Sequence, residues 1–407
     1  MVRRAASSNL GMLAASMHAA SEPDLFKSDL LPLFTTLSAD EQDSVRLLAV
    51  DNCVRVGKLL SVAENQTAVL PILRSVSQDK SWRVRYVVAE HFCELAGPVG
   101  PDVVRDELLP VFVSLLQDSE AEVRTAAAFR TTAFAATLPS DLVTSRVVPC
   151  VTELAADQSQ HVRAAMASVI MGLSPVIGRA ATMETLLPLF LQLLNDEFPE
   201  VRLNVIATLH EVNSVIGVDQ LSTSLLPAIA ELAQDRQWRV RQAIIEYVPL
   251  LASQLGADYF DEKLGAMCIG WLQDCVYSIR EAAIHNLRRL TQIFGAAWAV
   301  GHLLPPVLAN HTHTNYLYRL TALYSMCALA APAGSEALHS TVLPVILGMA
   351  ADPVPNVRFN VCKTLQHLLP LLDPAAVQEQ LKPCLTALSE DADADVRYFA
   401  SQALSAC

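Results

Sequence analysis

The chain has 407 residues, of which 52% are hydrophobic and 17% are charged, and its formal net charge is −13. This length exceeds that of one compact core, so the chain is either several domains or an array of repeats. A nucleic-acid-binding protein needs an excess of Lys and Arg to neutralise phosphates, and the acidic balance argues against that class. The apolar content excludes a disordered linker, and no apolar run reaches the roughly 18 residues that a membrane span needs.

The first 21 residues carry Arg3, Arg4 and several serines, and no acidic residue precedes Glu22. This composition is superficially that of a mitochondrial transit peptide. However, the dipeptide Val2-Arg3 repeats one that occurs throughout the chain. We therefore interpret residues 1–22 as the second helix of a half repeat, with Leu10, Leu13 and Met17 as an uncovered apolar stripe, and we expect the sequence to be truncated at its N-terminus.

Three positions recur at a period of 39 residues. An arginine, usually after Val, stands at the first, an aspartate six residues earlier at the second, and a proline eight residues before that at the third. The arginines are Arg46, Arg85, Arg124, Arg163, Arg202, Arg241, Arg280, Arg319, Arg358 and Arg397. His313 replaces the aspartate in one repeat and Ala266 replaces the proline in another. A fixed period at three positions indicates a repeat architecture.

Each repeat reads as two amphipathic helices. In the first full repeat, one apolar stripe comprises Phe26, Leu30, Leu33, Phe34 and Leu37, and a second comprises Val45, Leu48, Ala49, Cys53, Val56 and Leu60. Neither helix can bury its stripe alone, so neighbouring pairs must stack. We predict an all-α fold, an α-α superhelix with about ten full repeats and an N-terminal half repeat, in which the recurring proline kinks the first helix.

The recurring Asp lies at the turn within each repeat, where its carboxylate can accept N–H groups that open the second helix. The recurring Arg follows in the first turn of that helix. We predict that each Arg pairs with the Asp of the next repeat and forms a structural ladder. Ten copies of one pair are structural, so we do not interpret them as an acid–base catalyst. The ladder comprises Asp40, Arg46, Asp79, Arg85, Asp118, Arg124, Asp157, Arg163, Asp196, Arg202, Asp235 and Arg241, among others.

Function is expected where the repeats differ. The four residues between each Asp and its Val-Arg should align along one surface, which we call the turn ridge. Charged turns with alternating sign come first, and uncharged turns follow in the repeats of Val276, Tyr316 and Val354. Turns favour small polar residues, whereas Trp, Tyr and Arg anchor protein interfaces. Trp82 and Trp238 hold the same position four repeats apart, each beside an Arg, which points to two partner footprints. The alternative is that each ring folds back onto its own repeat.

The sequence shows no sign of enzyme or metal chemistry. It contains no Gly-rich phosphate loop, no G-x-S-x-G and no H-E-x-x-H motif. His302, His311 and His313 cluster in the repeat that lost its Asp, but no Cys or carboxylate stands at ligand spacing, so we predict no metal and no cofactor. The nine cysteines have no close paired spacing, and we interpret them as reduced, mostly buried thiols of a cytosolic or nuclear protein.

The repeats resemble the HEAT repeat, with a Pro in the first helix and Asp…Val-Arg at the second. Longer segments resemble, in colinear order, the scaffolding A subunit of protein phosphatase 2A. They include DEQDSVRLLAV at 40–50, DKSWRVRY at 79–86, PEVRLNVI at 199–206, WRVRQAIIEYVPLLASQLG at 238–256 and DPVPNVRFNV at 352–361. That family has fifteen HEAT repeats, and this chain matches the last half of the fifth through the fifteenth.

The resemblance implies a horseshoe-shaped scaffold that does no chemistry. Its C-terminal repeats would hold the catalytic subunit of the phosphatase, and earlier repeats an exchangeable regulatory B-type subunit, whose binding the missing repeats could weaken. Carried over by motif, the catalytic-subunit site comprises Trp238, Arg239, Val276, Tyr277, Tyr316, Pro355 and Asp393, and the regulatory-subunit site comprises Arg4, Glu41, Trp82, Arg83 and Glu122. Residues 23–217 would form the regulatory side and residues 218–407 the catalytic side.

A second interpretation is another kind of HEAT-repeat adaptor, a transport receptor of the importin type that wraps its cargo on a concave face. The acidic net charge is compatible with such a receptor. The aromatic residues of the turn ridge favour the phosphatase scaffold, because they place recognition at the turns. An enzyme is the least favoured interpretation, since the sequence offers no convergent nucleophile and base.

Overall fold

The computed structural model describes residues 1–19, 26–216 and 225–407, and these residues contain helices and no strands. They fall into two compact units, Met1–Leu221 and Ser222–Cys407. The predicted all-helical array of helix pairs is confirmed. The expected boundaries between residues 22 and 23 and between residues 217 and 218 lie outside the described residues.

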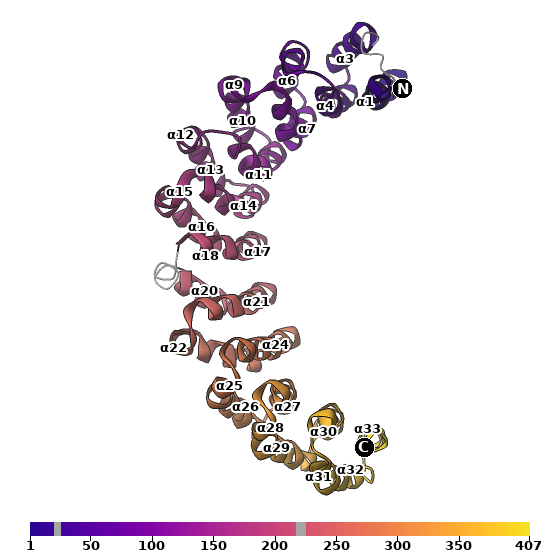
Figure 1. Cartoon of the computed structure of the whole chain (residues 1–407), viewed down its shortest axis with the longest axis vertical. Helices are drawn as coiled ribbons and strands as arrows, with labels where there is room; N and C mark the ends of the chain where they lie inside the picture. Colours follow the sequence, from indigo (N-terminus) through magenta and orange to yellow (C-terminus); the bar gives the residue numbers. More distant parts are fainter. Residues whose placement is uncertain (20–25, 217–224) are drawn as a thin grey trace. The chain divides into compact units, whose positions relative to one another are not determined.

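Within each unit the helices form two layers, because each repeat contributes its first helix to one layer and its second helix to the other (Figure 1). Second helices pack directly on one another from repeat to repeat, as α7 (Trp82–Glu90) does on α11 (Ala121–Ala135) and α24 (Tyr277–Phe294) on α27 (Tyr316–Ala333). The core of each unit is the continuous apolar seam between the layers.

In unit 1 the helices are α1 (Val2–Ala19), α3 (Leu31–Ser38), α4 (Asp43–Gly57), α5 (Val62–Glu64), α6 (Leu70–Ser77), α7, α8 (Phe92–Ala96), α9 (Pro101–Val103), α10 (Leu109–Leu116), α11, α12 (Ser140–Leu142), α13 (Val148–Ala155), α14 (Gln160–Ala167), α15 (Ser174–Ala181), α16 (Leu187–Leu194), α17 (Pro199–Ala207) and α18 (Leu209–Ile216). In unit 2 they are α20 (Leu226–Leu232), α21 (Trp238–Leu255), α22 (Ala257–Phe260), α23 (Ala266–Gly270), α24, α25 (Ala296–His302), α26 (Leu304–Ala309), α27, α28 (Ser335–Ala337), α29 (Leu343–Gly348), α30 (Pro355–Leu368), α31 (Pro374–Ala376), α32 (Lys382–Leu388) and α33 (Ala394–Ala406).

The first helix of most repeats contains a π turn immediately before its proline-containing segment. These turns are η1 (Phe26–Leu30), η2 (Asn65–Val69), η4 (Val104–Leu108), η5 (Val143–Val147), η7 (Thr182–Leu186), η9 (Asp261–Gly265), η12 (Leu338–Val342) and η15 (Val377–Leu381). The recurring proline is therefore the second residue of a new α-helical segment, where its missing N–H leaves little unsatisfied. The distortion that we expected from proline takes the form of a π turn. The repeat with Ala266 also has it, so there the turn does not depend on proline.

Glycines with positive φ precede several first helices at a common register that our sequence analysis missed. They are Gly100, Gly178, Gly256, Gly295 and Gly334, with φ between 78° and 94°, and Gly178 interrupts the helical backbone within α15. Because side-chain-bearing residues rarely adopt this backbone conformation, glycine is favoured there. Ser61 and Asp373 hold the same register and accept backbone N–H bonds from Glu64 and Ala376 instead.

Three phenylalanines form a fully buried cluster in unit 1. Phe92, Phe112 and Phe134 come from α8, α10 and α11, and their ring centroids lie 4.4–5.1 Å apart. The three helices belong to two successive repeats, so the cluster joins both layers and both repeats. Aromatic pairs at such distances stabilise a core beyond the area that they bury.

Two details of the expected apolar stripes are wrong. Leu33 is 42% exposed, whereas Phe34 and Leu37 are buried. The π turn at residues 26–30 does not account for this, because Ile72 holds the same position after the π turn of the next repeat and is buried. In the N-terminal helix, Leu10 is not uncovered, because it is buried in a face that packs on α4, whereas Leu13 is 50% exposed.

Candidate protein-interaction ridge

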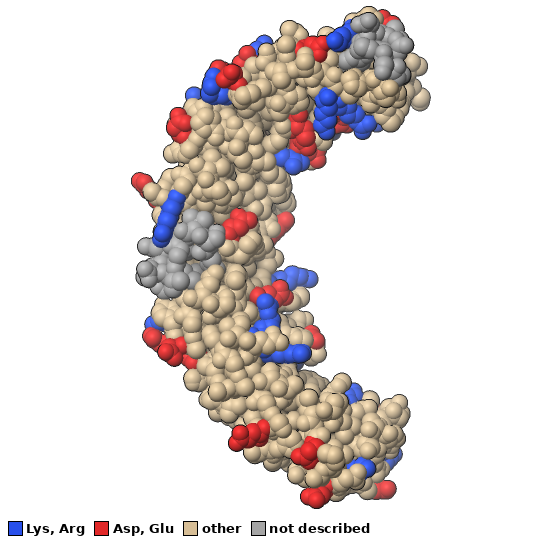
Figure 2. Space-filling view, viewed as in Figure 1, with Lys and Arg blue, Asp and Glu red and all other residues tan. Residues whose placement is uncertain are grey.

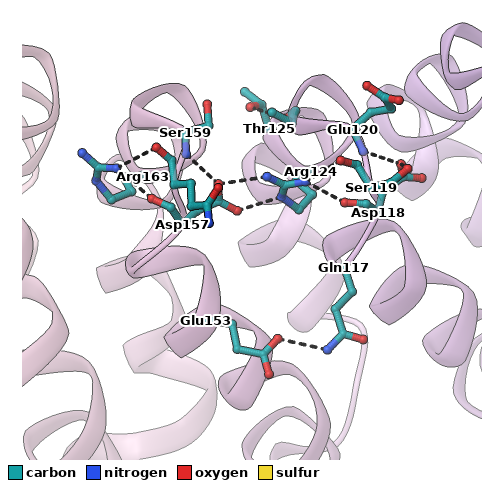
Figure 3. Close-up of polar contacts among 12 residues, drawn as sticks. Gln117, Asp118, Ser119, Glu120, Arg124, Thr125, Glu153, Asp157, Ser159 and Arg163 are labelled. Atoms are coloured by element: carbon teal, nitrogen blue, oxygen red, sulfur yellow. Dashed lines mark hydrogen bonds and ion pairs between the residues drawn. The ribbon is translucent and has the colours of Figure 1, made fainter.

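The ladder arginine links its own turn to the next repeat. Arg124 donates from Nη1 to the main-chain carbonyl of Asp118 at 2.7 Å. Its Nε and Nη2 donate to the two carboxylate oxygens of Asp157 at 2.7 and 2.9 Å (Figure 3). A guanidinium that grips a carboxylate with two parallel bonds is one of the stronger polar contacts in proteins. One side chain therefore both closes a turn and sets the stacking of two helix pairs.

The same two-bond geometry recurs along both units. It joins Arg46 to Asp79, Arg85 to Asp118, Arg124 to Asp157, Arg163 to Asp196, Arg241 to Asp274, Arg319 to Asp352 and Arg358 to Asp391. Arg202 donates to the carbonyl of Asp196 at 2.5 Å, and Asp235 accepts the N–H of Gln237 at 2.7 Å. An additional rung that sequence analysis did not identify joins Arg3 to Asp40 at 3.2 Å.

The pairing perturbs the ionisation of both partners. Burial alone would raise the pKa of Asp79, but hydrogen bonds from Arg46 and from the N–H of Ser81 together lower it. The same causes lower the pKa of Asp118 and Asp196. In return, the hydrogen bond to Asp79 raises the pKa of Arg46 although its burial opposes this. Both charges are therefore stabilised in the folded repeat.

The aspartate also determines where the second helix begins. Its Oδ1 accepts the N–H of the residue two positions later, as Asp79 does from Ser81 at 2.8 Å and Asp274 from Val276 at 2.8 Å. Ser81 and Val276 are the N-cap residues, so the aspartate precedes the cap and does not occupy it. Trp82 and Tyr277 are consequently the first helical residues rather than turn residues.

The two tryptophans are half-buried, and each is covered by the arginine that follows it. The guanidinium carbon of Arg83 lies 5.0 Å from the ring centroid of Trp82, and that of Arg239 lies 4.6 Å from the ring of Trp238. Both arginines are exposed. Part of each ring thus packs on its own repeat, and the remaining part and the arginine face solvent. This geometry combines the two interpretations that the sequence left open.

The remaining ridge residues of unit 2 present an uncharged aromatic surface. Tyr277 is 59% exposed and Tyr316 is 37% exposed, and both stand at the first residue of a second helix. Val276 is the half-buried N-cap before Tyr277. Exposed aromatic rings at repeated positions are typical of protein-binding surfaces.

Two further residues continue this ridge towards the end of the chain. Pro355 begins α30 and is half-buried. Asp393 is the N-cap of α33, and its side chain accepts the N–H groups of Asp395 and Val396. Asp393 therefore has a structural role in addition to any contact with a partner.

In unit 1 the ridge residues other than Trp82 are exposed and charged. Arg4 lies in α1, Glu41 directly precedes the N-cap of α4, and Glu122 is the second residue of α11. Arg83 lies 3.9 Å from Asp43, which also accepts the hydroxyl of Ser81 at 3.0 Å. On the visible face of each unit, acidic and basic side chains are interspersed and separated by wide uncharged areas (Figure 2).

The histidines of the repeat at 296–334 hold ordinary protein contacts. His302 lies 2.9 Å from Asp261, which also accepts the indole N–H of Trp298, and His311 lies 2.6 Å from the carbonyl of Leu308. Among residues 1–19, 26–216 and 225–407, no three His, Cys, Asp or Glu side chains are arranged to hold a metal ion.

In the same part of the chain, no single helix is long and apolar enough to cross a membrane. One bent pair of helices, Gln160–Ala167 with Ile170–Leu194, has the length and apolar composition of a membrane span, and these two properties are all that it shares with one. Among the cysteines, Cys53, Cys150, Cys268 and Cys362 are buried, but Cys275 is exposed.

Comparison with known families accounts for this architecture. Residues 101–178 match a family described as PPP2R1A-like HEAT repeat, residues 186–288 match HEAT repeats, and residues 69–97 and 342–372 each match a HEAT repeat. These matches together span more than half of the chain. The chain is a HEAT-repeat protein related to the scaffolding A subunits of protein phosphatase 2A.

Curated relatives carry the same description. The PP2A regulatory A subunit of Saccharomyces cerevisiae is 38% identical over 128 residues, which are 30% of this chain and 20% of that protein. The PP2A 65 kDa regulatory subunit of Drosophila melanogaster is 53% identical over 57 residues, 14% of this chain and 10% of that protein. The beta isoform of the 65 kDa regulatory A subunit of Homo sapiens is 54% identical over 52 residues, 13% and 9% of the two chains. The aligned segments thus span a fifth or less of the relatives' length.

Solved structures share the fold at low identity. A structure of Kap95p bound to RanGDP has a TM-score of 0.69 at 14% identity and covers 98% of this chain and 55% of that one. A structure of importin beta has a TM-score of 0.63 at 13% identity, with the same coverage. This likeness shows that the repeats stack as in other HEAT-repeat arrays.

Proposed function

We propose that this chain is a non-catalytic scaffold of a protein phosphatase 2A holoenzyme. Its unit 2 would hold the catalytic subunit on the ridge of Trp238, Arg239, Tyr277 and Tyr316, and its unit 1 would hold a regulatory B-type subunit on the ridge of Trp82 and Arg83. The observation that carries the proposal is the recurrence of a half-buried Trp stacked by an exposed Arg at one register in both units. The relatives support it, since they are named as regulatory subunits of this phosphatase.

The ridge is suited to binding a folded partner. Within each unit the ladder pairs join the start of one second helix to the turn before the next, so they hold neighbouring first helical residues in place. An anchor residue that is held in place before binding loses little conformational freedom when the partner arrives. The half-buried tryptophans and the exposed tyrosines have the size and chemistry of interface anchors.

The scaffold would act through proximity alone. Holding a substrate-selecting subunit together with a catalytic subunit on one chain replaces a chance encounter with a high effective concentration. No ridge residue has to act as an acid, a base or a nucleophile for this function. We further propose that the protein works in the cytoplasm and the nucleus, where its thiols stay reduced.

The experiment is a binding measurement with the purified catalytic subunit. We expect the folded chain to bind it, and we expect Trp238→Ala to weaken the binding by more than about tenfold, because interface anchors of this type contribute about 2 kcal/mol or more. Trp82→Ala is the matched control, since it removes the same ring with the same stacked arginine from unit 1. It should leave this affinity unchanged and weaken binding of a regulatory subunit.

Two outcomes contradict the proposal. If the folded chain does not bind the catalytic subunit, the scaffold function is wrong. If both tryptophan variants weaken it equally, the division into two footprints is wrong. The solved structures support the importin-type alternative only through a similar fold, and no ridge residue favours it.

A further inference from the structure

The ladder has one broken rung among the described residues of unit 2. Arg280 stands at the ladder register, but the next repeat carries His313 where the others carry Asp. Nη1 of Arg280 still donates to the carbonyls of Asp274 and Cys275, at 2.8 and 3.3 Å. Within residues 225–407, however, no carboxylate lies within ion-pair distance of this guanidinium, and its Nε and Nη2 donate no hydrogen bond.

His313 takes over only one of the two roles of the missing aspartate, which are to accept the N–H at the helix start and to pair with the arginine. Its Nδ1 accepts the N–H of Asn315 at 3.0 Å, as the aspartate Oδ1 does at the start of other second helices. An imidazole nitrogen that accepts a hydrogen bond carries no proton, so the neutral ring has its proton on Nε2 and cannot accept from an arginine there. The helix start is retained, and the acceptor for Arg280 is lost.

Arg280 is therefore a largely buried arginine without its usual counter-charge. It is only 8% exposed, similar to Arg319, which has its carboxylate partner. The ring of Tyr277 lies 5.7 Å from the guanidinium carbon, and a contact at this distance stabilises the positive charge only weakly. Both oxygens of Asp274 are already bonded to Arg241. Nε and Nη2 of Arg280 are not among the fully buried side-chain atoms that lack a partner, so they reach solvent, and a carboxylate from another protein can bond them there.

A pocket of about 340 Å³ lies beside this arginine. Arg280 and Tyr277 line it together with the apolar side chains of Ile284, Leu317 and Leu320. Glu281 and His285 of α24 and Asn356 of α30 complete the polar part of its wall. Leu317 is 37% exposed, so the pocket borders the aromatic surface of the unit 2 ridge. A protein that docks on this ridge can place a side chain in the pocket.

We propose that Arg280 binds, from this pocket, an Asp or Glu side chain of the protein that docks on unit 2, which supplies the counter-charge that His313 does not. The inference rests on the proposed function for the identity of that protein. The seven intact rungs show the binding geometry, in which Nε and Nη2 bond the two oxygens at 2.6–3.0 Å. A carboxylate fits this planar fork better than a lone acceptor does.

The decisive variant is His313→Asp, which supplies the carboxylate from within the chain and retains the bond to Asn315. We expect it to raise the thermal midpoint of the full chain and to weaken about tenfold the binding of the phosphatase catalytic subunit, because a charged hydrogen-bonded contact is then already occupied. Thr312→Asp is the matched control. It adds the same charge one residue away at an exposed position and should do neither.

The outcomes separate this inference from the proposed function. If His313→Asp does not raise the thermal midpoint, the position does not accept a carboxylate and the inference is wrong. If it raises the midpoint but leaves the affinity for the catalytic subunit unchanged, the partner does not bind Arg280. The inference is then wrong, and the scaffold function stands. If the control variant weakens binding equally, the effect is one of net charge and the inference is wrong.

A second measurement applies if the unmodified chain does not bind the catalytic subunit, which would refute the proposed function. The Nε–H resonance of Arg280, assigned with Arg280→Lys, is then followed by NMR during titration with sodium acetate against sodium chloride. A shift with acetate that His313→Asp abolishes supports the carboxylate site for another docking protein. The absence of such a shift overturns it.

Discussion

The rung between Arg46 and Asp79 offers a quantitative test of the ladder. Both side chains are only 8% exposed, and Arg46 bonds both carboxylate oxygens at 2.6 and 2.7 Å. Asp79→Ala leaves a buried guanidinium with two unmade bonds, and we expect a cost of about 3–5 kcal/mol. Arg46→Met leaves the carboxylate bonded only to the N–H of Ser81, with a cost of similar size. The double variant buries neither charge, so the coupling energy should be about 2–4 kcal/mol.

The assay is native-state hydrogen exchange in peptides that cover residues 79–90, because a repeat array need not unfold in one step. Arg83 and Asp43 form the control cycle. They join the same two repeats at 3.9 Å but are 62% and 39% exposed, so their coupling should not exceed about 1 kcal/mol. A coupling below about 0.5 kcal/mol for the buried rung would refute the claim that ladder pairs hold neighbouring repeats together.

Further predictions concern the core, acid stability and the thiols. Phe112→Ala should destabilise unit 1 by about 3–5 kcal/mol in urea unfolding, because it opens a cavity between two rings; a cost below about 1 kcal/mol would show that the cluster collapses to fill it. The lowered pKa values of Asp79, Asp118, Asp196 and Asp391 stabilise the fold fully above about pH 4 and lose this effect as pH falls through the folded values. Circular dichroism during acid titration checks this, and unfolding centred above about pH 5 would contradict it. Exposed Cys275 should react fastest with a thiol reagent and Cys275→Ser should remove that phase, whereas Cys268, whose pKa burial raises to about 12, should react only on unfolding. A second equally fast thiol would count against the described burial.

Much of the candidate site could be read from the sequence because the repeats are nearly identical in length. Given the period, Arg124 and Asp157 must recur in equivalent places, and two residues of opposite charge at the same layer are expected to meet. The positions of Trp82 and Trp238 followed from the same register. Their partial cover by Arg83 and Arg239 did not, because an adjacent side chain can turn towards a ring or away from it.

The N-terminal rung shows a limit of the fixed spacing. Arg3 and Arg46 stand 43 residues apart instead of 39, so the partner of Asp40 could not be found by counting. The structure identifies Arg3, since α1 packs on α4 as the second helices of neighbouring repeats do. The glycine register of Gly256, Gly295 and Gly334 was, by contrast, visible in the sequence at the same period and was overlooked.

The sequence by itself determined the fold class, the helix-pair repeat and the family, because a strict period at three positions leaves few other ways to bury the apolar stripes. Tertiary structure alone decided which side chains lie at the surface and which charges are compensated. Leu33 is exposed whereas Ile72, at the same position of the next repeat, is buried, because burial depends on what packs against each side chain. Arg280 has no carboxylate partner because His313 of the next repeat replaces the aspartate that stands 33 residues away in the other rungs. Only the stacked repeats show that His313 keeps the bond to the N–H of Asn315 but accepts none from Arg280.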